Sequence, residues 1–164
     1  MKKQKTWLAV LILVSIVGAL SPLVIGKAHV IDGDTLKVET IFGEKSIRLF
    51  GIDAVEKKQY CYRKLNHKPW PCGQEATRFL KTIAENKPVF CWSVDKDRYG
   101  RLVAVCYLGS KSLNAMMVEE GWAMDYARYS HGFYQSAQKE AQEQHKGIWS
   151  STFEKPAAYR LERR

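Results

Sequence analysis

Short runs of apolar positions, separated by turn-forming residues, dominate the first half of the chain after its N-terminal region. Leu36 and Val38 alternate with polar neighbours, which places them on one face of a strand. Polar turns separate such runs at residues 42–45 and at residues 95–101, where Gly100 lies. The pattern therefore predicts strands at residues 28–31, 35–40, 46–50, 89–94 and 102–108.

Three later segments carry apolar side chains at helical spacing. Residues 73–86 form the first of these, and a second predicted helix starts after the capping residue Ser112 and ends at Gly121. The third covers residues 134–146 and ends at Gly147. Five short strands with three helices predict an α+β domain built on a small antiparallel β-barrel.

The N-terminus has a different pattern. Lysines at positions 2, 3 and 5 precede an uncharged apolar run over residues 7–25, which favours a secretory signal. The run also reaches the lower limit for an uncleaved membrane anchor, and it lacks a clean Ala-x-Ala cleavage site. A buried core helix is disfavoured because the run has no helical alternation. Both remaining interpretations predict export to the periplasm or the extracellular space, with a possible membrane tether through residues 7–25.

Length and composition indicate one globular domain with short appendages. The chain has 164 residues, of which 46% are hydrophobic, enough for a real core, so a disordered chain is excluded. We expect a signal peptide or anchor at residues 1–26 and a globular domain at residues 27–150. A charged, frayed tail should follow at residues 151–164.

The charge of the chain changes this picture by suggesting a partner. Its formal net charge is +9, from 26 Lys and Arg against 17 Asp and Glu. A basic surface attracts polyanions, either nucleic acid or an anionic membrane face. A soluble protein that is simply basic would show the same balance, so charge alone leaves both interpretations open.

Four cysteines add a redox expectation: Cys61, Cys72, Cys91 and Cys106. An even count behind an export signal predicts two disulfides, with three pairings open. Cys61 and Cys72 flank the turn-forming residues of the expected loop at residues 60–71, namely Asn66, Pro69 and Pro71, and can close it locally. Cys91 and Cys106 lie at equal distances from the predicted hairpin turn and would face each other across two strands. A zinc site is disfavoured because the chain lacks a Cys-x-x-Cys pair.

Three polar clusters are candidates for chemistry, at residues 32–35, 48–56 and 97–101. Each has an ordinary structural interpretation when taken alone. Asp-Gly is a common turn, an arginine on a strand usually faces water, and charged residues are frequent in turns. The functional hypothesis depends on their combination.

The combination supplies what phosphodiester hydrolysis requires. Asp34 and Asp53 can offer two carboxylates to one hard cation. Glu56 lies three residues beyond Asp53, where it could approach an activated water without being a ligand. Arg48 and Arg101 add planar donors suited to a phosphate.

These motifs resemble those of the thermonuclease family, whose type member is staphylococcal nuclease. The similarity runs from about residue 28 to residue 149. It is carried by VIDGDT at residues 30–35, IRLFGIDAVE at residues 47–56 and DRYGRL at residues 97–102. The three motifs come in the family's order and at family-like spacing, which makes the match specific.

The resemblance implies an OB-fold barrel with three helices and calcium as the cofactor. By position, Asp34 and Asp53 would bind the ion through their carboxylates, and Ala54 through its main-chain carbonyl. Asp32 would lie in the outer shell of the ion.

The resemblance also implies an activity and the residues that perform it. Glu56 matches the family's general base or water-organising residue, and Arg48 and Arg101 match the two arginines that hold the scissile phosphate. Tyr129 is the expected substrate-contacting tyrosine. The implied reaction is hydrolysis of DNA and RNA by a monomer, leaving 3′-phosphates.

Two positions depart from the family's pattern. Val55 stands where the family usually has proline, so the backbone before Glu56 is less restricted. We expect this to lower the rate and not to abolish it. Residues 60–72 replace a lysine-rich loop and carry two cysteines. A disulfide there would add about 2–3 kcal/mol of stability by restricting the unfolded chain.

Two other functions compete with that of an active nuclease. The first is an OB-fold module that binds nucleic acid without cleaving it. Such modules typically lose the carboxylates or the arginines, both of which this chain retains. The second is a membrane-tethered interaction protein, for which those residues at family spacing would have no purpose.

Overall fold

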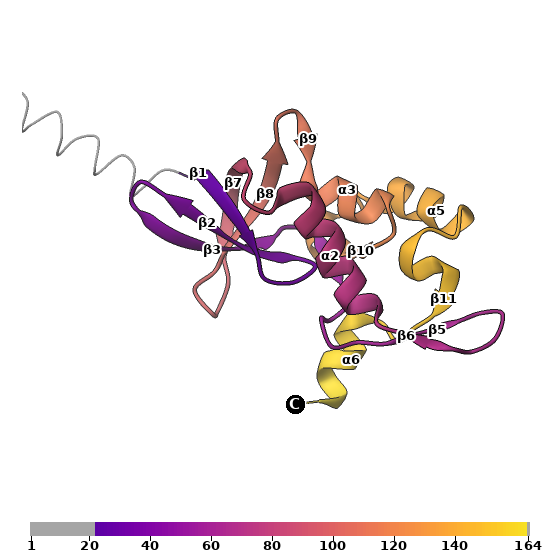
Figure 1. The fold of residues 1–164 in the computed structure, drawn as a ribbon. Helices are drawn as coiled ribbons and strands as arrows, with labels where there is room; N and C mark the ends of the chain where they lie inside the picture. Colours follow the sequence, from indigo (N-terminus) through magenta and orange to yellow (C-terminus); the bar gives the residue numbers. More distant parts are fainter. Residues whose placement is uncertain (1–21, 164) are drawn as a thin grey trace, which may run out of the picture.

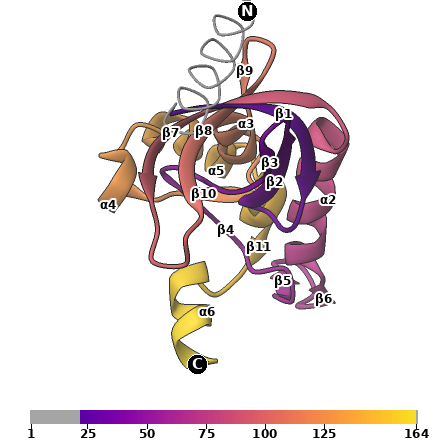
Figure 2. The same cartoon turned by 90° about the vertical axis from the view of Figure 1, so that its left-hand side faces the viewer.

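The computed structural model describes residues 22–163, whose centre is a five-stranded barrel (Figures 1 and 2). The strand order is β3-β2-β1-β7-β8, with antiparallel neighbours, and a parallel pairing of β3 with β8 closes the barrel. This confirms the predicted fold class. The strands are β1 (Leu23–Val30), β2 (Thr35–Thr40), β3 (Gly43–Leu49), β7 (Pro88–Lys96) and β8 (Leu102–Leu108), with a short β9 (Lys111–Ser112) at the edge.

The predicted helices lie to one side of the barrel (Figure 1). They are α2 (Cys72–Ala84), α3 (Leu113–Glu119) and α5 (Gln135–Glu143), joined by a short α4 (Ala127–Ser130) and a 3₁₀ turn η1 (Gly147–Ser150). Helix α2 buries Ala76 and Leu80 at helical spacing in the common core. Ser112 caps α3, as expected, by accepting a hydrogen bond from the amide of Ala115.

Strand β1 begins earlier than its sequence pattern predicts. The expected strand at residues 28–31 starts at Leu23, so part of the apolar run assigned to a leader pairs with β7. Val24, opposite Cys91, is buried in the core, while Leu23 and Ile25 lie on the outer face. Residues 1–21, which carry most of the leader prediction, lie outside the described residues. Within residues 22–163, no helix has the length and hydropathy needed to cross a membrane.

Two small sheets extend the barrel toward the helices. Strand β4 (Ile52–Ala54) pairs with β10 (Ala123–Asp125). Strand β5 (Cys61–Arg63) pairs with both β6 (Pro69–Trp70) and β11 (Ser151–Thr152), so the expected loop is a short hairpin. Disulfides join Cys61 to Cys72 and Cys91 to Cys106. Of the three connectivities that the sequence left open, this is the one in which both bonds are local.

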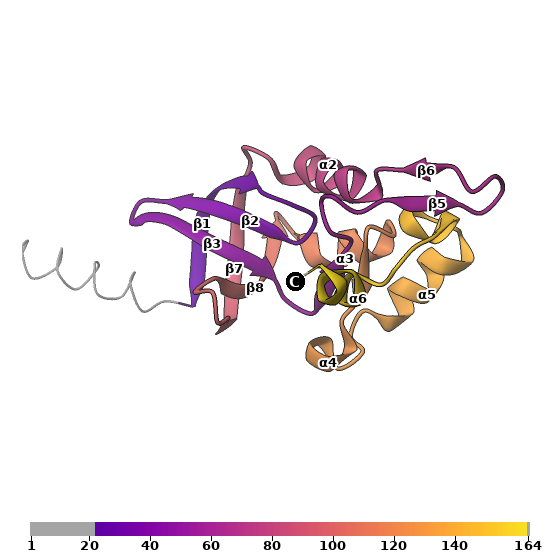
Figure 3. The same ribbon diagram turned by 90° about the horizontal axis from the view of Figure 1, so that it is seen from below.

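The expectation of a frayed C-terminal tail is wrong. Residues 151–152 form β11, and α6 (Pro156–Glu162) follows, drawn below the turn between β7 and β8 in Figure 2. Figure 3 shows α6 between the barrel strands and α5. The indole nitrogen of Trp70 donates to Ser151 Oγ at 2.7 Å, which attaches the segment to the β5–β6 hairpin. Pro156 is buried at the first position of α6, where its missing amide hydrogen costs no hydrogen bond. The high charge of residues 151–164 was therefore not a sign of disorder.

We predict that replacing Cys61 and Cys72 together by serine lowers the free energy of unfolding by about 2–3 kcal/mol. The disulfide closes a loop with a sequence separation of 11, and its loss frees the unfolded chain. Urea unfolding of the oxidised wild type and the double variant measures the difference. The same comparison under reducing conditions should remove it, and a difference that persists there would contradict the assignment.

Candidate active site

Asp34 is directed inward by a tight turn between β1 and β2. The amides of Ile31 and Asp32 both donate to the carbonyl of Thr35, at 3.0 and 3.2 Å. The amide of Asp34 donates to Asp32 Oδ1 at 3.0 Å, which completes an Asx turn. Only 5% of Asp34 is exposed, so this turn delivers a carboxylate into the protein.

Asp53 reaches the same place from β4. Gly51, at φ +74°, turns the chain between β3 and β4. A Cβ atom on Gly33 would lie 2.8 Å from the Cβ atom of Ala54, so glycine lets the two acid-bearing segments approach. The amide of Ala54 then donates to Asp34 Oδ2 at 3.3 Å. Asp53 is also only 5% exposed.

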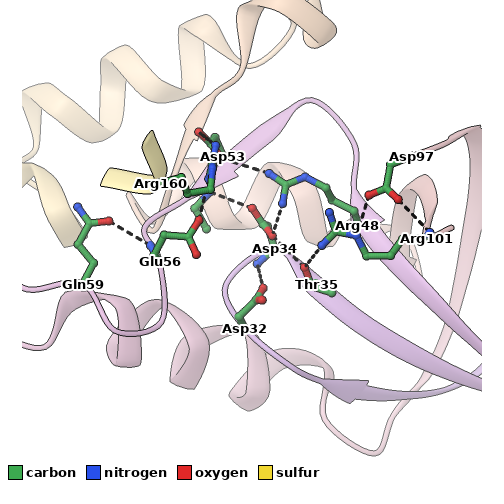
Figure 4. Close-up of polar contacts among 11 residues, drawn as sticks. Asp32, Asp34, Thr35, Arg48, Asp53, Glu56, Gln59, Asp97, Arg101 and Arg160 are labelled. Carbon is green, nitrogen blue, oxygen red and sulfur yellow. Dashed lines mark hydrogen bonds and ion pairs between the residues drawn. The ribbon is translucent and has the colours of Figure 1, made fainter. Parts of the chain in front are cut away.

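Arg48, on β3, joins the two buried carboxylates (Figure 4). Its Nη1 lies 3.0 Å from Asp34 Oδ1, and its Nη2 lies 3.2 Å from Asp53 Oδ1. An unpaired carboxylate in such a place would be costly, and charge-assisted hydrogen bonds offset that cost. The structure thus brings together three of the residues that the sequence motifs selected.

Arg101 is held beside this group by Asp97, a residue to which the sequence analysis assigned no role. Asp97 Oδ2 accepts from Arg101 Nε at 2.7 Å, and Asp97 Oδ1 accepts from the amides of Tyr99 and Arg101. Although burial opposes ionisation, the hydrogen bonds from Arg101 hold the pKa of the Asp97 carboxyl below its usual value. Arg101 Nη1 lies 3.4 Å from Thr35 Oγ1, next to Asp34.

Glu56 and Asp32 complete the acidic set from opposite sides. The side chain of Glu56 is about one third exposed, and its amide donates to Gln59 Oε1 at 3.1 Å. Burial, and then the charge of Asp34, raise the pKa of Asp32 to about 6. Asp32 lies beside Asp34, whose amide donates to its side chain, and its role in the outer shell of an ion stays a prediction.

The site contains one residue that the sequence analysis missed altogether. Arg160, on α6, donates from Nη1 to Asp53 Oδ1 at 2.9 Å and to Glu56 Oε1 at 2.7 Å. Its Nη2 donates to Asp53 Oδ2 at 3.0 Å. Although burial disfavours the charge, these carboxylates raise the pKa of Arg160 above its usual value. Pro156 signals a helix start in the sequence, but no local pattern indicates what Arg160 contacts.

Two hollows meet at Arg48 and Arg160. The smaller, of about 290 Å³, is lined by the acidic residues Asp32, Asp34 and Glu56 and by Arg101. The larger, of about 730 Å³, has several aromatic residues in its lining, and Tyr129 is one of them. Tyr129, half exposed on α4, therefore lines the larger cavity and not the smaller one, where Asp34 and Glu56 lie. An extended ligand with an anionic group could lie in both hollows at once.

The donor set fits a hard divalent cation. An ionised carboxylate has about four lone-pair positions. Three are used on Asp34, by Thr35, Arg48 and Ala54, and three on Asp53, by Arg48 and Arg160. Each keeps capacity for one cation contact, which carbonyl and water oxygens would supplement. Within residues 22–163, no three His, Cys, Asp or Glu side chains gather as a preformed metal cluster.

Comparison with known proteins finds a nuclease family and similar proteins that include nucleases. Residues 46–151 match the family model described as staphylococcal nuclease homologue. The chain is 35% identical over 158 residues to the succinoglycan biosynthesis protein ExoI of Rhizobium meliloti, covering 95% of this chain and 80% of that protein. It is 35% identical over 129 residues to a thermonuclease of Staphylococcus hyicus (75% and 73%). It is 38% identical over 122 residues to an uncharacterized endonuclease of Haemophilus influenzae (73% and 62%).

We predict that Asp32→Asn stabilises the cation-free protein at neutral pH. The folded-state pKa of Asp32, about 6, lies above the ordinary 3.8, so the folded protein binds this proton more tightly than the unfolded chain. Its stability therefore decreases as pH rises from about 4 through 6, and the cost is fully present above that window. Asparagine keeps the Oδ1 acceptor of the Asx turn without the charge.

Thermal unfolding in chelator, followed by circular dichroism, measures this effect. The melting temperature of Asp32→Asn should exceed that of the wild type at about pH 7.5 and approach it at about pH 4. An equal difference at both pH values would show that charge at Asp32 is not the cause.

Proposed function

The chain belongs to the staphylococcal nuclease family, and on that premise we propose that it is a divalent-cation-dependent endonuclease of DNA and RNA. The observation that carries the proposal is one hollow lined by Asp34 and Glu56 together with Arg48 and Arg101. Asp53 joins this group by accepting a hydrogen bond from Arg48. Buried acids alone would suit many functions. Acids interleaved with guanidiniums, on a chain of net charge +9, suit a phosphodiester.

The two arginines would bind the scissile phosphate. Asp97 binds Arg101 through Nε, and Arg101 Nη1 lies near Thr35 Oγ1. The guanidinium lines the smaller hollow, where its Nη donors can meet a phosphate. Arg48 contacts Asp34 and Asp53 and lines both hollows, where a phosphate oxygen can meet it. Planar guanidiniums held in this way stabilise the charge that develops on the phosphorus substituents. Nucleotides beside the phosphate would extend toward Tyr129 in the larger cavity.

Glu56 would orient the attacking water and accept its proton. It lines the smaller hollow with about one third of its side chain exposed, so water can reach it. A divalent cation at Asp34 and Asp53 would supply charge neutralisation at the phosphate. Oxygen-only ligands and the family resemblance support calcium as that ion, and the resemblance supports 3′-phosphate products.

We also propose that the enzyme works outside the cytoplasm. Two disulfides favour an oxidising compartment, because thiols are kept reduced in the cytosol. The lysines and the apolar run of the N-terminal sequence support the same conclusion.

We predict that the oxidised protein degrades plasmid and single-stranded DNA when calcium is added, and that chelator stops the reaction. Arg48→Ala and Glu56→Ala should each reduce turnover by about 100-fold or more, because each removes a group that acts in the transition state. Arg78→Ala is the matched control. Among residues 22–163, this exposed arginine on α2 forms its ion pair with Glu75, outside the site, and its loss should leave turnover unchanged.

Gel assays of product length, together with melting curves of each variant, test this prediction. Binding of DNA without cleavage under any divalent cation would contradict the nuclease assignment. It would favour a module that binds nucleic acid without chemistry. Equal turnover by Arg48→Ala and Arg78→Ala would show that cleavage takes place elsewhere.

A further inference from the structure

Arg160 comes from the most distant segment of the chain that contributes to the site. It lies 107 residues from Asp53 and 104 residues from Glu56 in sequence. One guanidinium thereby holds a proposed cation ligand and the proposed base together (Figure 4). Its side chain is about one third exposed and borders both hollows, so it faces the space that substrate would enter.

Arg160 supplies the fixed contact of the Glu56 carboxylate. Among residues 22–163, the hydrogen bond to the Glu56 carboxylate comes from Arg160, whose Nη1 lies 2.7 Å from Glu56 Oε1. Asp53, in contrast, is also held by Arg48. Without Arg160, Glu56 would keep only its backbone anchor on Gln59, and its side chain could take several rotamers.

The segment that carries Arg160 is firmly attached to the same loop. Gln59, whose Oε1 accepts from the amide of Glu56, donates from Nε2 to the carbonyl of Glu154 at 2.6 Å. Ser151 of β11 pairs with Arg63 of β5, and the Cys61–Cys72 disulfide closes the β5–β6 hairpin that contains Arg63. The C-terminal segment thus restrains both the backbone and the carboxylate of Glu56.

We propose that Arg160 is a positioning residue of the nuclease site, which fixes the Glu56 carboxylate relative to Asp53. This replaces restraint that the chain lacks at Val55, where it has no proline to fix the backbone before Glu56. A bidentate guanidinium suits the task because its planar donors set direction as well as distance. Asp53 keeps one lone-pair position that is not used by Arg48 or Arg160, so its carboxylate can contact Arg160 and a cation at the same time.

This inference rests on the proposed nuclease function, and steady-state kinetics at saturating cation test both. Arg160→Ala should lower kcat by about 10- to 100-fold while KM changes by less than about 3-fold, because misplacing a base affects the reacting step more than binding. Arg160→Lys should recover part of the loss, since lysine restores charge without the bidentate geometry. Millimolar guanidinium should partly restore the kcat of Arg160→Ala.

Arg163→Ala is the matched control, at the C-cap of the same helix. Arg163 contacts Glu154, Glu162 and the ring of Tyr159, and none of the acidic residues of the site. Its loss should leave kcat unchanged and unaffected by guanidinium. Chemical rescue confined to Arg160→Ala separates positioning from a general loosening of α6, because a displaced helix would not respond to a small cation.

Calcium binding measured by calorimetry without substrate gives a readout independent of turnover. Arg160→Ala should bind calcium at least as tightly as the wild type, because a neighbouring positive charge is gone. Slower turnover with undiminished calcium binding supports positioning. Faster turnover would overturn the proposal in favour of a blocking contact, and turnover equal to that of Arg163→Ala would also overturn it. A wild type that fails to cleave with any cation would instead overturn the nuclease function, and this inference with it.

Discussion

Two buried carboxylates held beside each other by guanidiniums are the constraint around which the rest of the structure is arranged. Asp34 and Asp53 are each 5% exposed and would repel each other if they were left alone. Arg48 bridges them from β3, and Arg160 holds Asp53 from α6. Pairing of this kind makes the burial of charge tolerable, but it contributes little net stability compared with an apolar core. The arrangement is therefore better explained by function than by stability.

The barrel provides the rigidity that such a group needs. Arg48 lies opposite Thr35 on β2 and beside Val103 on β8, at the place where the parallel pairing closes the sheet. Its backbone is thus fixed on two sides. The carboxylates, in contrast, lie on the turn before β2 and on the short strand β4, which are kept in place by side-chain hydrogen bonds and by the close approach of Gly33 to Ala54. The guanidinium of Arg48, fixed by the barrel, thus donates to carboxylates that are carried by a turn and a short strand.

Local sequence was sufficient for some of these features and insufficient for others. The strands at residues 35–40 and 102–108 were predicted correctly because their patterns are short and bounded by turns. The start of β1 was missed because Leu23 and Ile25 are apolar on the outer face, so the strand merges with the apolar run before it. Asp97 lies four residues from Arg101, and a search for turn-stabilising carboxylates could have found it. Arg160 could not be found in this way, because a contact that spans 107 residues leaves no periodic trace.

The distance in sequence between Arg160 and its partners also bears on how the protein acquires its site. The barrel strands end at residue 108, well before α6, so the barrel can form while the last contacts are still absent. Contacts between segments far apart in sequence carry the largest loop-closure entropy and tend to form late. Assembly of the site would thus be one of the final events of folding. A chain interrupted between α5 and α6 would keep its barrel and its paired acids but would present a Glu56 without its partner.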